Sequence, residues 1–267
     1  MHPARESIER IIGRFEIAGR LAGGDIALVQ RLHTQNGDYV LKSGTANGVF
    51  ASEAYGLMLM AQAGVTVPEV VDHSDSYLLM RYLPPGKADE ATAGEMLARL
   101  HASSAAGFGL DRDTYLATLK QNNKTSESWA DFFFAQRLFP LVAELDTDDL
   151  AQWRQFAERV RPLLAECSVP ALLHGDLWSG NLYYSATGPV FIDPACYFGD
   201  PLVDVAMTQL FGGFGQSFYS AYFAVVGRRH DEADLLRVYQ LYPLLVHARL
   251  FGGGYYRSAC VVRDRYL

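Results

Sequence analysis

The stretch between residues 172 and 194 holds the polar side chains best suited to catalysis. Residues 172–181 read LLHGDLWSGN, and a second apolar run ends at Asp193. Asp176 and Asn181 lie five positions apart in a polar loop between the two short apolar runs, and Asp193 follows Asn181 by twelve positions. A strand–loop–strand unit would bring these three side chains together, so we expect one site there.

These three residue types suit phosphoryl transfer to a hydroxyl group. Hard oxygen ligands from Asn181 and Asp193 fit Mg²⁺ beside substrate phosphates, and Asp176 could orient and deprotonate an attacking hydroxyl. His-x-Asp-x₄-Asn with a downstream Asp is the layout of kinase-like sites. The alternative is that Asp176 caps a turn and Asn181 forms one. The other half of the sequence helps to decide between these interpretations.

The N-terminal half contains candidates for nucleotide binding. Gly23 and Gly24 lie between two predicted strands, where backbone amides could approach phosphates, although such a pair also forms ordinary hairpin turns. Lys42 ends the strand-like run 39–42 and could contact phosphates. Glu53, early in the next predicted helix, could pair with the Lys42 ammonium.

A third nucleotide-binding candidate is the strand that leaves the predicted sheet. Met80, Arg81, Tyr82 and Leu83 precede the double proline at 84–85. The backbone here could offer a carbonyl and an amide to the edge of an adenine ring, with the Met80 side chain packing nearby. A plain core strand followed by a turn would serve these residues equally well.

Hydrophobic periodicity predicts a β-rich N-terminal part and a helical C-terminal part. Proline disfavours both helices and central strands, so we place a boundary at residues 84–86, giving an N-lobe at 1–83 and a C-lobe at 84–267. The expected N-terminal elements are a three-stranded meander over 15–42, a helix at 50–63, and strands at 70–72 and 77–82. The expected C-terminal helices are 89–101, 128–145, 148–166, 202–210, 217–227 and 231–251, with short apolar runs at 171–174, 182–184 and 190–193.

Composition limits the possible partners and compartments. The chain has 267 residues, 49% of them hydrophobic, and a formal net charge of −7. An acidic chain without a basic block is unsuited to nucleic acid or anionic membranes, and no apolar run is long enough to span a bilayer. Three scattered cysteines lack zinc-ligand spacing and indicate a reducing, cytoplasmic location. The oligomeric state is not encoded in any recognisable pattern.

The motifs resemble one known family over nearly the whole chain. The sequence is similar to the fructosamine kinases, or ketosamine-3-kinases, which are related to aminoglycoside phosphotransferases and choline kinases. The Trp-Ser-Gly between the Asp and the Asn distinguishes this family from its antibiotic-modifying relatives. The matching segments are HGDLWSGN at 174–181, IDPACYFGDPLVDVAM at 192–207, YQLYPLLVHARLFGG at 239–253, MRYLPPG at 80–86 and WADFFFAQRL at 129–138.

The resemblance implies a bilobal, protein-kinase-like α+β fold that binds ATP and Mg²⁺. It also implies phosphorylation of the 3-hydroxyl of a ketosamine, a sugar adduct on an amine, and thereby a role in protein deglycation. By motif, the implied roles are Asp176 as the base, Asn181 and Asp193 as metal ligands, Lys42 and Glu53 at the phosphates, Arg81, Tyr82 and Leu83 at adenine, and Asp200 and Asp204 as braces of the catalytic loop.

The acceptor side is less well defined by sequence. Trp178 could stack on a sugar face or fill a core gap, and Tyr197 and His247 could line the acceptor pocket or belong to the core. Other acceptors, such as an aminoglycoside, choline or a sugar, would use the same core residues, and the acidic stretch 144–149 would suit a cationic one. A nucleotide-binding module without catalysis is the third alternative.

Overall fold

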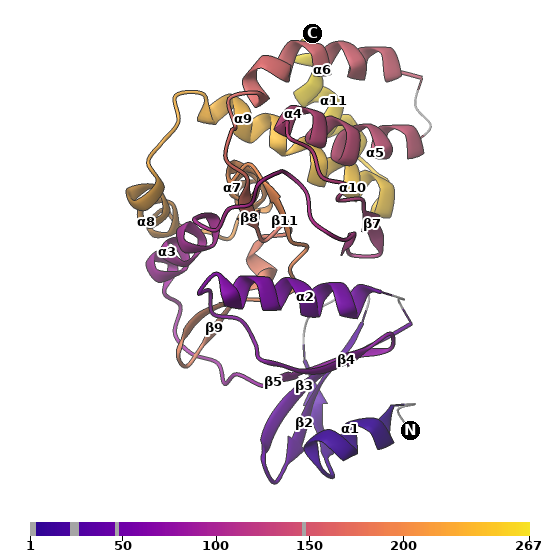
Figure 1. The fold of residues 1–267 in the computed structure, drawn as a ribbon, viewed down its shortest axis with the longest axis vertical. Helices are drawn as coiled ribbons and strands as arrows, with labels where there is room; N and C mark the ends of the chain where they lie inside the picture. Colours follow the sequence, from indigo (N-terminus) through magenta and orange to yellow (C-terminus); the bar gives the residue numbers. More distant parts are fainter. Residues whose placement is uncertain (1–3, 22–26, 46–47, 146–147) are drawn as a thin grey trace.

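The computed structural model describes residues 4–21, 27–45, 48–145 and 148–267. Its N-terminal part is built on a five-stranded antiparallel sheet with the order β1-β2-β3-β5-β4 (Figure 1). A tight turn at Asn36-Gly37 joins β2 to β3, and Gly37 has a φ of 110°, which favours glycine. The strands are β1 (Glu16–Arg20), β2 (Leu28–Thr34), β3 (Gly37–Ser43), β4 (Val70–Ser74) and β5 (Tyr77–Arg81).

Each face of this sheet is covered by one helix. Side chains alternate between the faces of a strand, so Leu41 and Leu79 pack in a small core with α1 (Arg5–Ile12), whereas Leu78 joins the main core with α2 (Val49–Gln62). Lys42 follows Leu41 in β3 and therefore points to the α2 side of the sheet. The period-2 pattern thus sets which residues can meet α2.

The remainder of the chain is mainly helical, as the sequence predicted, and α3 packs along α8 (Figure 1). Among the described residues, no helix combines the length and the apolar character needed to cross a membrane. The boundary at 83/84 stays a prediction. The helices are α3 (Glu90–His101), α4 (Trp129–Phe132), α5 (Phe139–Glu144), α6 (Leu150–Leu164), α7 (Leu202–Phe211), α8 (Gln216–Val226), α9 (Glu232–Tyr239), α10 (Leu241–Phe251) and α11 (Tyr255–Asp264).

Two short antiparallel strand pairs carry the loops with the candidate catalytic residues. In one pair, β8 (Ala171–Leu173) lies beside β11 (Tyr197–Gly199), and in the other, β9 (Leu182–Ser185) lies beside β10 (Gly188–Phe191). The loop after β8 leads to β9 and the loop after β10 leads to β11, so each of the two loops connects one strand pair to the other. A further hairpin, β6 (Thr114–Leu116) with β7 (Leu119–Gln121), contacts α2.

The structure differs from the predicted elements where proline interrupts a helical pattern. The helix predicted at 231–251 is two helices, because Pro243 lacks an amide and its ring conflicts with a helical carbonyl four residues earlier. The helix predicted at 128–145 contains a π-helical turn, Phe133–Leu138. Pro140 cannot donate to the Gln136 carbonyl, which instead accepts from Arg137 Nη1 at 3.2 Å. The sequence did not predict β6, β7, β11 or α11.

Candidate active site

The loop after β8 brings Asp176 and Asn181 into direct contact. Residues Ser179–Asn181 form a 3-10 turn that folds the loop back on itself. The Asn181 side-chain amide Nδ2 donates to the Asp176 carbonyl oxygen at 2.8 Å and to Asp176 Oδ2 at 3.1 Å. These two bonds fix the orientation of the Asn181 amide, with its nitrogen on the Asp176 side.

Hydrogen bonds also join this loop to the segment that contains Asp193. The Ile192 amide donates to the Asn181 carbonyl at 3.0 Å, and the Ala195 amide donates to the His174 carbonyl at 2.8 Å. The His174 ring contacts the Ile192 carbonyl through Nε2 at 2.9 Å. The two loops are thus held side by side, as the predicted strand–loop–strand unit requires.

Two residues in these loops have left-handed backbone conformations. Gly175 has a φ of 81°, and a Cβ atom at this position would lie 2.2 Å from the Ala195 carbonyl oxygen, so only glycine fits. Asp193 has a φ of 56°, which is uncommon outside glycine and more often tolerated by Asp and Asn. The close approach of the two loops therefore depends on Gly175.

A buried charge cluster links this C-terminal site to the N-terminal sheet. Lys42 Nζ lies 2.6 Å from Glu53 Oε1 and also forms an ion pair with Asp193. Burial lowers the pKa of Lys42, but the charges of Glu53 and Asp193 raise it more, so the ammonium stays protonated. Burial raises the pKa of Glu53 to about 7, although Lys42 opposes this shift. The predicted Lys42–Glu53 pair is confirmed.

The candidate base Asp176 lies in an environment that favours its protonated form. Burial raises the pKa of Asp176 well above its usual range, and the nearby charge of Asp193 raises it further. The hydrogen bond from Asn181 acts in the opposite direction. A carboxylate with a raised pKa is a better proton acceptor once ionised, which suits general base chemistry.

Of the two acids expected to brace the catalytic loop, only Asp204 does so. Asp204 Oδ2 accepts from the His174 amide at 2.7 Å, and Oδ1 accepts from the Gly175 amide at 2.9 Å. Burial alone would raise the pKa of Asp204, but its hydrogen bond with His101 and the surrounding positive charge lower it below the usual value.

The expectation for Asp200 is wrong. Its side chain accepts from the Leu202 amide at 2.9 Å, from Arg229 Nη1 at 2.9 Å and from the Tyr239 hydroxyl at 2.8 Å. Asp200 therefore fixes the start of α7 and not the catalytic loop. Its side-chain partners, Arg229 and Tyr239, lie 29 and 39 residues away in the sequence, and the motif alone could not distinguish the two roles.

Sequence reasoning missed His101 as a second supporting residue. His101 is 8% exposed at the end of α3, and its ring contacts Asp204 Oδ2 at 3.1 Å through Nε2. Its other ring nitrogen, Nδ1, lies 2.9 Å from the Tyr222 hydroxyl. Because His101 ends a helix with an otherwise apolar buried face, no pattern in the sequence singled it out.

The predicted adenine-binding strand is β5 and the residues after it. Met80 is buried within β5, opposite Val40. The amides of Arg81 and Tyr82 donate to the Glu69 and Asp38 carbonyls at 2.9 and 3.1 Å. These two amides are therefore engaged by the sheet.

The remaining candidates for nucleotide binding are the Arg81 side chain, the Leu83 backbone and the two glycines. The Arg81 side chain points back over the sheet, with Nη1 donating to the Tyr39 hydroxyl at 2.7 Å. The Leu83 carbonyl accepts from the Tyr183 hydroxyl at 2.9 Å. Gly23 and Gly24 lie outside the described residues.

The three acceptor candidates lie in unlike environments. The Trp178 side chain is 42% exposed, and its ring covers Gly180, where a Cβ atom would lie 2.2 Å from the ring. His247 Nδ1 donates to the Pro243 carbonyl oxygen at 2.8 Å. Its ring lies among aromatic neighbours, namely Phe211, Phe251 and Tyr255.

Tyr197 requires a correction. Its side chain is 1% exposed and packs in the core against Phe132, with the Arg137 guanidinium 4.0 Å from its ring centroid. A side chain buried in this way does not reach an acceptor. We therefore exclude Tyr197 from the acceptor side of the site.

Two acids of the stretch considered for a cationic acceptor are paired with arginines of the same chain. Glu144 pairs with Arg249 at 3.0 Å, and Asp149 forms an ion pair with Arg263. Asp149 also accepts from the Tyr256 hydroxyl at 2.5 Å. Residues 146 and 147 lie outside the described residues. Glu144 and Asp149 thus bind their own chain, which weakens the argument for a cationic acceptor.

The following features define a phosphotransferase of the kinase-like fold. They are the antiparallel sheet with α2, the Lys42–Glu53 pair, and the loops that carry Asp176 and Asp193. A family model described as fructosamine kinase matches residues 5–267, and the chain belongs to this family.

Curated relatives agree with this assignment. The chain is 36% identical to a probable ketoamine kinase of Enterococcus faecium, over 93% of this chain and 95% of the relative. It is 34% identical to the chloroplastic protein-ribulosamine 3-kinase of Arabidopsis thaliana, over 93% of this chain and 82% of the relative.

Solved structures support the fold. A putative fructosamine-3-kinase from Thermobifida fusca superposes with a TM-score of 0.90 at 26% identity, covering 99% of this chain and 98% of the other. The aminoglycoside phosphotransferase APH(4)-Ia, solved with AMP-PNP and hygromycin B, superposes with a TM-score of 0.64 at 22% identity, covering 98% and 95% of the two chains. This second likeness concerns the fold alone.

Proposed function

We propose that this chain transfers the γ-phosphoryl group of ATP to the 3-hydroxyl of a ketosamine. The observation that carries the proposal is the contact of Lys42 with both Glu53 and Asp193, beside a loop in which Asn181 contacts Asp176. Lys42, as the cation that binds phosphate, and Asp176, as the proton acceptor, thus lie next to the two proposed metal ligands, Asn181 and Asp193. Family membership and the names of the relatives support the ketosamine as the acceptor.

In this proposal the nucleotide binds between β3, α2 and the residues after β5. Lys42 contacts the phosphates while Glu53 holds its ammonium, and Gly23 and Gly24 remain candidates for phosphate contact. Because the amides of Arg81 and Tyr82 are engaged by the sheet, the donor to adenine is the amide of Leu83. Met80 packs beneath the ring.

The donor set at Asn181 and Asp193 fits a magnesium ion. The Asn181 nitrogen is committed to Asp176, so the amide oxygen is left for the ion, and Asp193 adds a carboxylate. Oxygen donors of this kind are the usual protein ligands of Mg²⁺ next to substrate phosphates. When held by Asn181 and Asp193, the ion would supply positive charge that neutralises the charge developing on the phosphates.

Asp176 acts as the general base in this proposal. Its Oδ2 atom is held by Asn181, so Oδ1 receives the proton of the sugar hydroxyl. Asp204 holds the adjacent amides of His174 and Gly175 at the start of the loop and keeps the carboxylate in position. The rest of the acceleration comes from positioning and electrostatics, as in other phosphoryl transfers.

The product explains a role in deglycation. Phosphate on the carbon beside the ketone becomes a leaving group after enolisation, and its loss leads to release of the amine. A cytoplasmic location belongs to the same proposal, and it agrees with free thiols at Cys167, Cys196 and Cys260. We also retain the division into a nucleotide-binding N-lobe, 1–83, and a C-lobe, 84–267, that supplies the base and the acceptor pocket.

An acceptor panel tests the proposal. Purified protein is incubated with ATP and Mg²⁺ and with fructosamine, ribulosamine or erythrulosamine adducts, each titrated, and the phosphorylated position is assigned by NMR. We expect phosphate on the 3-hydroxyl of at least one adduct. Phosphorylation of hygromycin or choline alone would replace the ketosamine assignment. Nucleotide binding without transfer to any acceptor would favour a non-catalytic module.

A further inference from the structure

Helix α2 carries Glu53, and its main chain touches the segment that contains Asp193. Gly56 is buried one turn beyond Glu53. A Cβ atom at Gly56 would lie 2.9 Å from Pro194 Cγ and 3.4 Å from Cys196 Sγ. The thiol of Cys196 also lies 3.7 Å from the Gly56 carbonyl oxygen. The absence of a side chain at Gly56 therefore lets α2 lie directly against Pro194.

A glycine at this position is otherwise unfavourable. Glycine in the middle of a helix is a poorer helix former than alanine, and the φ of Gly56 is not among the positive values that would favour glycine. Neither helix propensity nor backbone conformation explains the residue. The close approach to Pro194 does.

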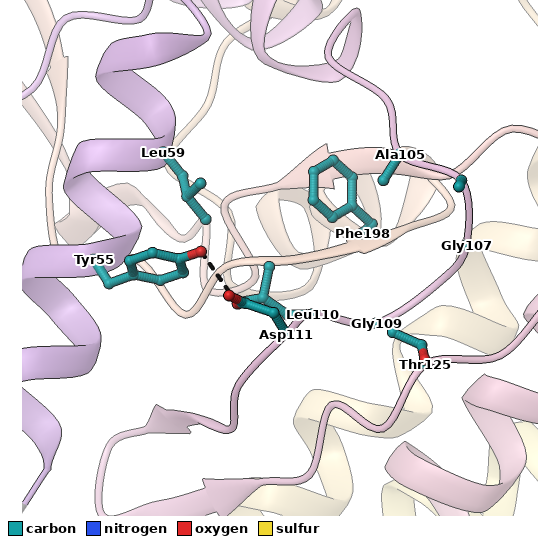
Figure 2. A pocket seen from close by; sticks show the side chains of 10 residues that line it. Tyr55, Leu59, Ala105, Gly107, Gly109, Leu110, Asp111, Thr125 and Phe198 are labelled. Carbon is teal, nitrogen blue, oxygen red and sulfur yellow. Dashed lines mark hydrogen bonds between the residues drawn. The ribbon is translucent and has the colours of Figure 1, made fainter.

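Tyr55, which precedes Gly56 in α2, connects the helix to a second segment of the chain. The Tyr55 hydroxyl donates to Asp111 Oδ1 at 3.1 Å, and the Arg112 guanidinium lies 3.6 Å from the centroid of the Tyr55 ring. Figure 2 shows Tyr55 reaching from α2 to Asp111 beside a cavity of about 320 Å³. Because this cavity separates part of α2 from the segment 105–111, the Tyr55–Asp111 bond supports the helix where close packing is absent.

We propose that Gly56 is a positioning residue for nucleotide binding, with Tyr55 as its auxiliary. The contact of Gly56 with Pro194 sets the distance of α2 from the Asp193 loop. That distance in turn places Glu53 where it holds Lys42 next to Asp193. The helix is thereby fixed in the position that the phosphates require, before the nucleotide arrives. This inference rests on the proposed function, because it assigns Lys42 to the nucleotide phosphates.

The Gly56→Ala variant tests the proposal. Isothermal titration with AMP-PNP and Mg²⁺ gives the nucleotide Kd, and steady-state kinetics separates the KM for ATP from the KM for the acceptor. The added methyl group overlaps Pro194 and displaces α2, so we expect the Kd and the KM for ATP to rise about tenfold. The KM for the acceptor should stay unchanged.

Two controls separate positioning from general damage. Met58→Ala changes the exposed outer face of the same helix, where Met58 is 43% exposed, and should leave the nucleotide Kd at the wild-type value. Gly94→Ala places a Cβ atom 2.2 Å from the Phe218 carbonyl oxygen between α3 and α8. It should lower the melting temperature, and the folded fraction should bind nucleotide like the wild type.

Two further variants keep the proposal open to refutation if Gly56→Ala does not fold. Tyr55→Phe removes only the hydrogen bond to Asp111 and should raise the nucleotide Kd about threefold. Adding Pro194→Ala to Gly56→Ala removes the Cγ atom nearest to the new methyl group and should restore part of the lost affinity.

Wild-type nucleotide affinity in folded Gly56→Ala, or in Tyr55→Phe where Gly56→Ala does not fold, would overturn the proposal. Failure of the proposed function gives a different result. In that case the wild-type protein would transfer no phosphate to ketosamines. The nucleotide affinities of the variants would still show whether the position of α2 controls nucleotide binding.

Discussion

The nucleotide side and the acceptor side of Asp176 are built in different ways. On the nucleotide side, the Lys42 and Glu53 side chains are 9% and 12% exposed and hold each other by charge. On the acceptor side, the candidates are aromatic surfaces: Trp178 is 42% exposed and Phe251, beside His247, is 59% exposed. One side is a preformed charge cluster, and the other is an open apolar surface.

The difference shows how each side selects its ligand. Buried opposite charges interact strongly because little water screens them, so the position of Lys42 is fixed by its partners. Exposed rings bind by stacking on apolar faces, which tolerates variation in the attached group. The phosphoryl donor is therefore expected to be discriminated by charge geometry, and the acceptor mainly by shape. Three substitutions test this contrast.

The largest effect is expected at the junction of the two sides. Asp176→Ala removes the proposed proton acceptor and leaves Lys42 and Glu53 in place. General base catalysis contributes roughly 10²–10⁴-fold, so we expect kcat to fall about a thousandfold or more. The nucleotide Kd, measured by isothermal titration, should change little. Phosphorylation at the wild-type rate would refute the base assignment.

The next largest effect concerns the brace behind the catalytic loop. Asp204 is 1% exposed and accepts from the amides of His174 and Gly175. Asp204→Asn leaves at least one buried donor without its acceptor and removes a charge, so unfolding in urea at pH 7 should show a loss of about 3 kcal/mol. Asp38→Asn, on the partly exposed pair with Arg31, serves as the control and should show a smaller loss.

The effect of Asp204→Asn on the free energy of unfolding should depend on pH in a defined direction. The pKa of Asp204 is lower in the folded chain than its ordinary value of 3.8. Its stabilising contribution is therefore complete above pH 4 and is lost as the pH falls through the folded pKa. The stability difference between wild type and Asp204→Asn should shrink as the pH drops below about 4. A difference that stays constant from pH 7 to pH 3 would contradict this role.

The smallest effect is expected on the acceptor side. Trp178→Ala removes an exposed ring that could stack on the sugar, and stacking contacts are worth about 0.5–1.5 kcal/mol, so the KM for the ketosamine should rise about three- to tenfold. The KM for ATP should not change. Tyr197→Phe is the matched control, since this buried ring should leave both KM values unaltered. An equal rise for both substrates in Trp178→Ala would argue against stacking.

Spacing was sufficient to predict part of the site. Asp176 and Asn181 share one loop, and Lys42 and Glu53 belong to a strand and the helix that follows it, so short-range geometry limits where they can lie. The contact of Lys42 with Asp193 spans 151 residues, and the sequence did not predict it. Sheet alternation explains the face of Lys42 but not its distant partner.

The features that sequence reasoning missed depend on packing between distant segments. Gly56 looked like an ordinary helix residue until Pro194 was seen against it, and His101 has polar partners on two other helices. Tyr197 was misplaced because an aromatic residue near a motif can face either the core or a pocket. Prolines lie near the points where the predicted helices are interrupted. The π-helical turn near Pro140 could be recognised only in the three-dimensional structure.

A crystal structure with AMP-PNP, Mg²⁺ and a ketosamine tests the central claim most directly. We expect the ion on the oxygens of Asn181 and Asp193, Lys42 at the phosphates, and the 3-hydroxyl of the sugar within hydrogen-bond distance of Asp176. An ion bound away from both ligands, or a sugar whose hydroxyl groups all lie remote from Asp176, would contradict it.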